Sequence, residues 1–470
     1  MNLVKKKEPN LKNQVFMPNW LVYTQCTLFA ILFGIWVLPE TILVRHVCLI
    51  IGALLSLYAI NQNRPIFLAR LAIPIILIGL LFFWVFFHGL FLTNDFDAQW
   101  LEFTTIWKRA AIGFIFAIGL GISIGGQAKT NPRESISSWW IMYCGLALPT
   151  IIFWLKYLAT LISSRYLVEI PEYFMLYEES AKFFVHKSAY VFFCLPLFGV
   201  SLGRLYQIYR RAQLWQFESI IYLVSIFAVL FNFIVEKDRN GEIYAFLLGM
   251  VFCILILKDQ LKSFSYQKIL LGCLITLIPV LSALYQFRNN PQWNTIFSDA
   301  KIAVQIDKYN NWQDQDRLLP PINDQGKRIY GTNYERIAWG TAALRLIQQN
   351  PLGYGLVERS FGRLGQKVWP EAKLHQSHSA WLDFALGLGI PGIIFLLGAG
   401  ILSWQQAKQV DSPWSVMGQW GLGAILLLMC TTELSQKVYI DGLIFMISFI
   451  SSLSLILSNT NPATMNRFKS

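Results

Sequence analysis

The chain has 470 residues, of which 55% are hydrophobic and only 14% are charged, and its mean hydropathy is +0.46. Soluble domains are about one quarter charged, so this composition excludes the class of soluble enzymes. The net charge of +12 does not indicate a nucleic-acid partner, because lysine and arginine collect in the cytoplasmic loops of membrane proteins.

Stretches of about 20 apolar residues recur along the whole sequence, and a helix of that length crosses a bilayer with its backbone groups hydrogen-bonded internally. The predicted fold class is therefore an all-α integral membrane protein with about twelve transmembrane helices. The predicted spans lie near residues 20–38, 41–60, 67–92, 107–125, 137–162, 185–203, 217–235, 241–257, 268–286, 378–403, 414–432 and 438–457.

Basic residues gather in one set of the loops between these spans, such as those holding Arg64, Arg133 and Arg210. The positive-inside rule makes this side cytoplasmic, and both termini, which are also basic, fall on it. The opposite loops then face the periplasm or the exterior.

Residues 287–377 form one long polar segment on that outer side, between the ninth and tenth spans. Prolines interrupt the segment, so we expect short helices joined by loops. The chain therefore divides into an N-terminal membrane region of about nine helices (1–286), this insertion, and a C-terminal membrane region of about three helices (378–470).

One helix within the insertion has clear sequence boundaries. Thr332 and Glu335 fit a capping box at its start, and Asn350–Pro351 ends it. Glu335 either pairs with an arginine or serves only as a capping residue. Arg336 lies in the first turn of the same helix.

Two histidines, His375 and His378, lie where the insertion meets the tenth span. They would share one helical face if the helix began before them. Histidine titrates near neutral pH and can take a proton from a sugar hydroxyl, and the alternative is a polar interfacial residue with no special role. A zinc site is not expected, because a third ligand with recognisable spacing is missing. Asp383 would lie on a different helical face from His378.

Several cationic residues lie at span ends on the outer side. Arg239 belongs to the short loop before the eighth span. Guanidinium groups form bidentate bonds to phosphate, so Arg239 and Arg336 together could hold a pyrophosphate, whereas either one alone could be a snorkelling or ion-paired arginine. Three further cations violate the positive-inside bias and are either anion contacts or interfacial anchors: Lys108, Arg109 and Lys187.

These features follow a fixed order along the chain. Arg239 at a span mouth precedes ERIAWGTAALRLIQQNPLGYG, which precedes HQSHSAWLDFALGLGIPG. In this order, residues 230–400 resemble the O-antigen ligase family, which also contains O-antigen polymerases and bacterial protein O-oligosaccharyltransferases. The family's histidine, which stands before a helix ending in a GxxG turn, matches His378, and the family's arginines match Arg239 and Arg336.

The sequence departs from the family pattern at two positions. Gly387 stands where an acidic residue is common, and His375 is three rather than two residues before His378. The resemblance nevertheless implies a glycosyltransferase of the membrane class C type, embedded in the bacterial inner membrane together with its lipid-linked substrate.

The resemblance also implies a reaction on the periplasmic face. An undecaprenyl-pyrophosphate-linked glycan would be transferred to the lipid A–core of lipopolysaccharide, with inversion and with no metal or cofactor. His378 would be the general base, and Arg239 and Arg336 would bind the pyrophosphate. The candidate accessory residues are His375, Glu335, Lys187, Lys108 and Arg109.

Three other functions remain open from the sequence. A protein O-oligosaccharyltransferase would use the same donor with a pilin or another exported protein as acceptor, and an O-antigen polymerase would join two lipid-linked glycans. A transporter of lipid-linked sugar would suit intramembrane charges such as Arg45 and Asp383. A transporter, however, does not need a polar insertion with a histidine at its return to the membrane.

Overall fold

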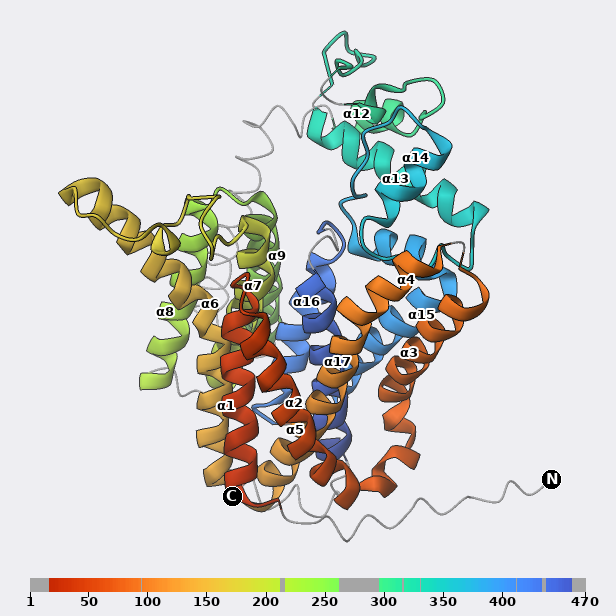
Figure 1. The fold of residues 1–470 in the computed structure, drawn as a ribbon. Coiled ribbons are helices and arrows are strands. Elements are labelled where there is room, and N and C mark those ends of the chain that lie inside the picture. The colour runs from red at the N-terminus through yellow and green to blue at the C-terminus, as the bar shows by residue number, and fades with distance from the viewer. Residues whose placement is uncertain are drawn as a thin grey trace.

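The protein is a bundle of long helices with a smaller group of helices, α12, α13 and α14, on one end (Figure 1). This computed structural model describes residues 17–93, 95–211, 216–261, 296–314, 317–329, 331–410, 412–432 and 437–458. Within these ranges the chain forms helices and loops with a single isolated bridge between Ile322 and Arg328, and no β-strand. The predicted all-α fold class is confirmed.

The α-helices of the described residues have these bounds: α1 Asn19–Trp36, α2 Ile42–Gln62, α3 Ile73–Phe91, α4 Phe96–Glu102, α5 Lys108–Thr130, α6 Pro132–Tyr166, α7 Lys187–Arg210, α8 Phe217–Val235, α9 Arg239–Leu261, α12 Ile296–Ala303, α13 Gly331–Gln349, α14 Ser360–Val368, α15 Ala380–Lys408, α16 Gly423–Leu428 and α17 Lys437–Ser458. Two π-helical segments, η3 (Phe103–Trp107) and η6 (Met417–Leu422), continue into α5 and α16.

Ten helices of the described residues are long and apolar enough to cross a membrane. They correspond to ten of the twelve predicted spans, and the segment Phe96–Thr130, which joins α4, η3 and α5, counts as one of them. The predicted span at 268–286 lies outside the described residues. The predicted span at 414–432 is a shorter apolar helix, Met417–Leu428.

The centre of the bundle depends on close approach between α5 and its neighbours α2 and α17. A side chain on Gly119 would collide with Ser56 of α2, and one on Gly121 would collide with Ser452 of α17. Small residues at such crossings let two helix backbones approach closely, which favours helix association in a bilayer. The α17 helix is buried at every residue from Tyr439 to Ile456, so it is a core helix rather than a lipid-facing one.

The insertion has an apolar cluster of its own. Trp312, Tyr334, Leu346 and Phe361 are buried there, together with Leu386 of α15. The α13 helix ends at Gln349, as the Asn350–Pro351 pair predicts, but it begins at Gly331. The observed start therefore lies one residue before Thr332, the first residue of the capping box that the sequence suggested.

The helix that follows the insertion, α15, is broken at Gly389, which has a φ of 69° that favours glycine. The break frees backbone carbonyls, and the loop before α14 binds them. Tyr354 N donates to Leu386 O at 3.0 Å, and Gly355 N donates to Gly387 O at 2.7 Å. This loop therefore lies directly against α15, between the insertion and the membrane helices.

The close approach explains the glycine at position 387 and gives a testable prediction. A Cβ on Gly387 would lie 2.7 Å from Leu356 O and 2.9 Å from Val357 Cα, which leaves no room for an acidic side chain. We expect Gly387→Ala to lower the unfolding temperature, with a cost of about 1–3 kcal/mol from overpacking. Thermal unfolding in detergent, followed by tryptophan fluorescence, measures this change.

The matched control is Gly398→Ala on the same helix. A Cβ there meets only Leu77 Cδ1, at an ordinary 3.7 Å. We expect an unchanged or higher unfolding temperature, because alanine is the better helix former. Equal effects of the two substitutions would contradict the tight contact at Gly387.

Candidate functional site

Arg239 is the first residue of α9, at the end of the bundle that carries the insertion, and its side chain is exposed. The preceding turn is fixed by Asp238, whose buried carboxylate accepts hydrogen bonds from Asn240 N at 2.9 Å and Gly241 N at 3.2 Å. A carboxylate at a helix N-terminus satisfies backbone N–H groups that have no partner within the helix. This local structure holds Arg239 at the mouth of the helix.

Arg336, on α13 of the insertion, reaches the same place. Its half-buried guanidinium donates from Nη1 to Asn240 Oδ1 at 3.5 Å, so it contacts the residue next to Arg239. One turn further along α9, Tyr244 shares a 3.0 Å hydrogen bond with Thr431, which follows α16. The two predicted phosphate-binding arginines are therefore neighbours in space although they are 97 positions apart in the printed sequence.

His378 lies against the same helix of the insertion. Its ring stacks on Trp339, with the centroids 5.1 Å apart and the planes at 17°. Trp339 is one turn after Arg336 on α13, and its indole donates to Trp312 O at 3.0 Å. The imidazole of His378 is half-buried, so the stacking fixes the ring while leaving part of it accessible.

The backbone of His378 has a φ of 57°, in the left-handed region, and α15 begins only at Ala380. The helical spacing considered for His375 and His378 therefore does not apply, and His375 is exposed in the preceding loop. The interpretation of Asp383 also changes. Its buried carboxylate accepts hydrogen bonds from Ser377 N at 3.1 Å and Ser377 Oγ at 2.6 Å, so it fixes the residue before His378.

Glu335 belongs to the same group of side chains. Burial raises the pKa of its carboxyl group, and the electrostatic interaction with His378 acts in the opposite direction. Glu335 is therefore an acidic neighbour of the histidine.

Lys187, the first residue of α7, is exposed near the turn before α9. The pKa of the Glu236 carboxyl group is raised to about 7, mainly by burial and then by the charge of Asp238. The charge of Lys187 acts in the opposite direction and lowers this pKa. Glu236 was not among the residues predicted from the sequence. The only signal for it was the position of an acidic residue directly after the apolar run of α8.

Lys108 and Arg109 begin α5, and the structure gives them different surroundings. Lys108 is exposed, whereas Arg109 is buried and forms an ion pair with Asp441 of α17. Arg109 is thus tied to the interior of the bundle. The pairing fits the general rule that buried charges are paired.

A second buried carboxylate, Glu102 at the end of α4, holds the loop before α14. Val357 N lies 2.9 Å from Oε1 and 3.0 Å from Oε2, and Glu358 N donates to Oε2 at 3.0 Å. Glu358 also pairs with Lys437 at 3.3 Å. These contacts connect α4 and α17 to the segment that leads to His378.

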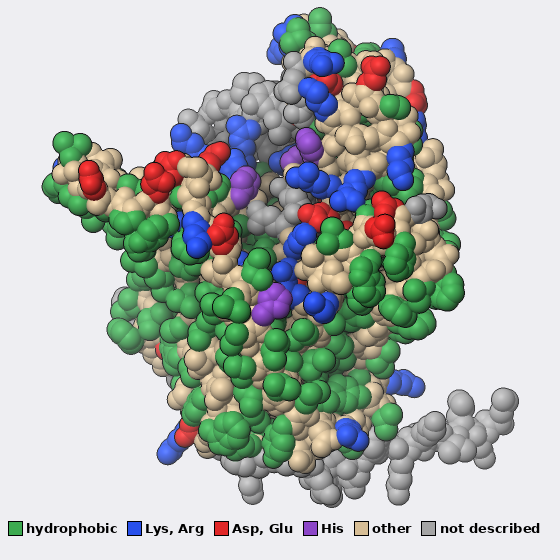
Figure 2. Space-filling view, viewed as in Figure 1, with side chains coloured by type: hydrophobic (Ala, Val, Ile, Leu, Met, Phe, Trp, Pro, Cys, Tyr) green, Lys and Arg blue, Asp and Glu red, His purple; other side chains and the backbone are tan. Residues whose placement is uncertain are grey.

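Many charged side chains lie where the insertion meets the bundle. Figure 2 shows Lys and Arg side chains there, with His, Asp and Glu side chains among them, while hydrophobic side chains cover most of the bundle below. Among the described residues, no three His, Cys, Asp or Glu side chains lie close enough together to hold a metal ion. The charge on this face suits an anionic ligand at a boundary between water and membrane.

Comparison with known proteins adds to this geometry. No curated protein matches the chain. The family model described as O-antigen ligase matches residues 224–397, the range that contains Arg239, Arg336 and His378. The match confirms the resemblance seen in the sequence motifs, and it supports the O-antigen ligase family for residues 224–397 of this multi-pass membrane protein.

Proposed function

We propose that the protein transfers a glycan from undecaprenyl pyrophosphate to the lipid A–core of lipopolysaccharide, on the periplasmic face of the bacterial inner membrane. The supporting observation is one continuous series of contacts. Arg336 bonds to the residue beside Arg239, and one turn along the same helix Trp339 stacks on His378. Two guanidinium groups and one imidazole are thereby collected at the end of the bundle that carries the insertion.

In the proposed reaction, Arg239 and Arg336 bind the pyrophosphate of the donor, because guanidinium groups form bidentate, charge-assisted hydrogen bonds to phosphate oxygens. His378 takes the proton from an acceptor hydroxyl. The hydroxyl oxygen then bonds to the anomeric carbon while the bond from that carbon to the pyrophosphate oxygen breaks. The leaving pyrophosphate keeps the electron pair, and direct displacement inverts the anomeric centre.

The arginines stabilise the charge that develops on the leaving group. Fixed positive groups aimed at a developing anion act most strongly where water is excluded. The leaving group is a pyrophosphate neutralised by arginine, so the proposed reaction requires no metal ion or cofactor. The polyprenyl tail of the donor would remain in the bilayer beside the membrane helices.

The function is tested with purified protein in detergent. The protein is incubated with undecaprenyl-pyrophosphate-linked glycan and lipid A–core, and the glycosylated lipid is detected by gel shift and mass spectrometry. We expect transfer without any other protein, which a transporter would not give. Transfer only to a pilin or another exported protein would instead identify a protein O-oligosaccharyltransferase, and extension of the lipid-linked glycan would identify a polymerase.

A further inference from the structure

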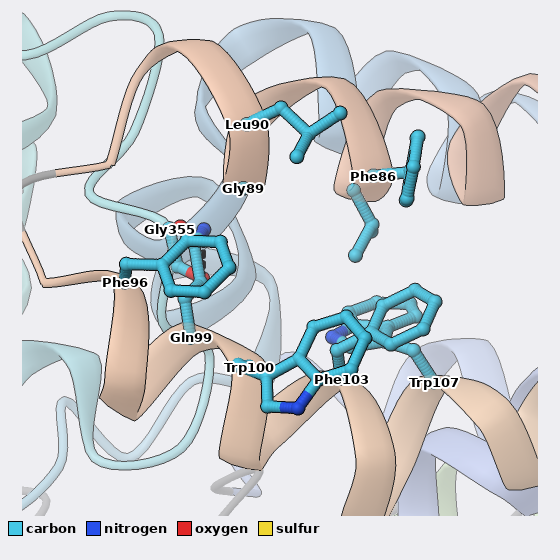
Figure 3. A pocket seen from close by; sticks show the side chains of 10 residues that line it. Phe86, Gly89, Leu90, Phe96, Gln99, Trp100, Phe103, Trp107 and Gly355 are labelled. Atoms are coloured by element: carbon cyan, nitrogen blue, oxygen red, sulfur yellow. Dashed lines mark hydrogen bonds between the residues drawn. The ribbon is translucent and has the colours of Figure 1, made fainter.

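A hollow lies between α3 and the segment formed by α4 and η3, and neither Arg336 nor His378 lines it. Its empty space is about 380 Å³ when the solvent on its open side is included. Figure 3 shows side chains of the two helical segments facing one another across it. The lining residues are Val85, Phe86, Gly89, Leu90, Phe96, Gln99, Trp100, Phe103, Trp107 and Gly355.

The walls of this pocket are apolar and partly exposed. Phe86 is 48% exposed, Leu90 50% and Trp100 53%. These residues belong to two of the segments that are long and apolar enough to cross a membrane. The open side therefore faces hydrocarbon, and the aromatic walls suit a lipid chain.

The floor of the pocket is polar, in contrast to its walls. Gln99 is only 6% exposed, and its amide nitrogen donates to Gly355 O at 2.7 Å and bonds to His88 Nδ1 at 3.0 Å. Its carbonyl oxygen, Oε1, is buried and has no hydrogen-bond partner among the described residues. A Cβ built on Gly89, another lining residue, would lie 3.9 Å from Oε1, so this acceptor is directed toward the pocket.

A buried acceptor without a donor costs free energy, because it has lost its bonds to water. A ligand that enters the pocket and donates a hydrogen bond to Gln99 Oε1 would remove this cost. Neither a polyprenyl chain nor a plain fatty-acyl ester carries a donor at its hydrocarbon part. An acyl chain with a hydroxyl group or an amide linkage does.

We propose that this pocket binds an acyl chain of the acceptor lipid, a chain that carries a hydroxyl or amide N–H and donates it to Gln99. The inference rests on the proposed function, because only that function makes the glycan acceptor a lipid rather than a protein. The floor also connects to the site, because Gly355 bonds to Gly387 of α15, the helix that directly follows His378 and Ser379. A chain held here would keep its lipid at the side of α15.

Binding is tested without turnover. The full-length protein is placed in vesicles of phosphatidylethanolamine and phosphatidylglycerol with a 3-hydroxyacyl amide that bears a diazirine at the end of its chain. After illumination, we expect labelled peptides from α3 and α4. A matched probe with an ester linkage and no hydroxyl should label these peptides more weakly, because it cannot donate to Gln99.

Two substitutions on α3 provide the matched comparison. Gly89→Leu fills the pocket, whereas Gly79→Leu points into open space, since a Cβ there meets nothing within 4 Å. We expect Gly89→Leu to lower labelling at least about tenfold, which corresponds to about 1.4 kcal/mol, and Gly79→Leu to leave it unchanged. Gly89→Ala, with its single ordinary contact at 3.9 Å, should lower labelling partly and serves if the leucine variant does not fold.

The outcomes separate this inference from the proposed function. Equal labelling of the Gly89 and Gly79 variants, or equal labelling by the two probes, would overturn the pocket assignment, and so would stronger labelling by a diazirine analogue of undecaprenyl phosphate. If lipid A–core still accepted glycan in that case, the proposed function would stand. Labelling as predicted without any glycan transfer would support the pocket and count against the function.

Discussion

Replacing His378 by asparagine is expected to lower the rate of glycan transfer by about 10²–10⁴-fold, the usual contribution of a general base. Asparagine tolerates the left-handed backbone at this position better than most residues, so the loop should keep its conformation. The loss then reflects the missing imidazole rather than a changed fold. The measurement is the initial rate of transfer from undecaprenyl-pyrophosphate-linked glycan with purified protein.

The control is His46→Asn, the same substitution in α2. His46 bonds through Nδ1 to Ile42 O within its own helix and belongs to no part of the proposed site. Its rate should stay close to that of the unmodified protein. If the His378 variant transferred glycan as fast as the His46 variant, another group would have to take the proton, and the assignment of the base would be wrong.

Replacing Arg336 by lysine is expected to have the second largest effect. Lysine keeps the positive charge but cannot form the bidentate bonds that a guanidinium makes to phosphate oxygens. Arg336 Nη1 also donates to Asn240 Oδ1 at 3.5 Å, and a lysine would offer one ammonium group there in place of the planar guanidinium. We expect transfer to fall by about 10²–10³-fold, as for the loss of one group that stabilises developing charge. Rates measured over a range of donor concentrations give this value.

Arg345 provides a matched control on the same helix, α13. It forms two hydrogen bonds of 2.6 Å to Asp307 and is partly exposed, and it takes no part in the proposed site. Arg345→Lys should therefore leave transfer almost unchanged. Equal rates for the Arg336 and Arg345 variants would show that Arg336 does not bind the pyrophosphate.

The fold class could be predicted from hydropathy. A helix satisfies its backbone hydrogen bonds internally, and it needs about 20 mostly apolar residues to cross a membrane, so each span leaves a long apolar stretch in the sequence. The exact extent of each helix could not be predicted this way. The apolar run at 414–432 contains only the short helix Met417–Leu428, since hydropathy measures composition and not where a helix begins or ends. The same limit applied to α13, which begins before Thr332.

The candidate site was predicted at the level of residues and not of geometry. The sequence placed His378 where the polar insertion meets the tenth span. Its predicted helical spacing to His375 was wrong, because α15 starts only after Ser379 and both histidines lie before it. Serine directly before an apolar run is a common N-cap, and this signal could have located the helix start. The carboxylate of Asp383 then returns to Ser377, which a regular helix through His378 would not permit.

Contacts between distant parts of the chain could not be predicted from spacing. Arg109 pairs with Asp441, which is 332 residues away, and Glu102 binds Val357, which is 255 residues away. No motif in the sequence around these residues indicates their partners. Only the packing of α4 and α5 against later segments gives them partners.

The most direct test of the proposed site is a structure of the protein with an undecaprenyl-pyrophosphate-linked glycan bound. We predict that phosphate oxygens lie within hydrogen-bond distance, about 2.7–3.2 Å, of the guanidinium of Arg239 or Arg336. The anomeric oxygen of the donor should then face the side of α13 on which Trp339 stacks with His378. Phosphates held only by Lys108 and Arg109, with Arg239 and Arg336 unoccupied, would contradict the account.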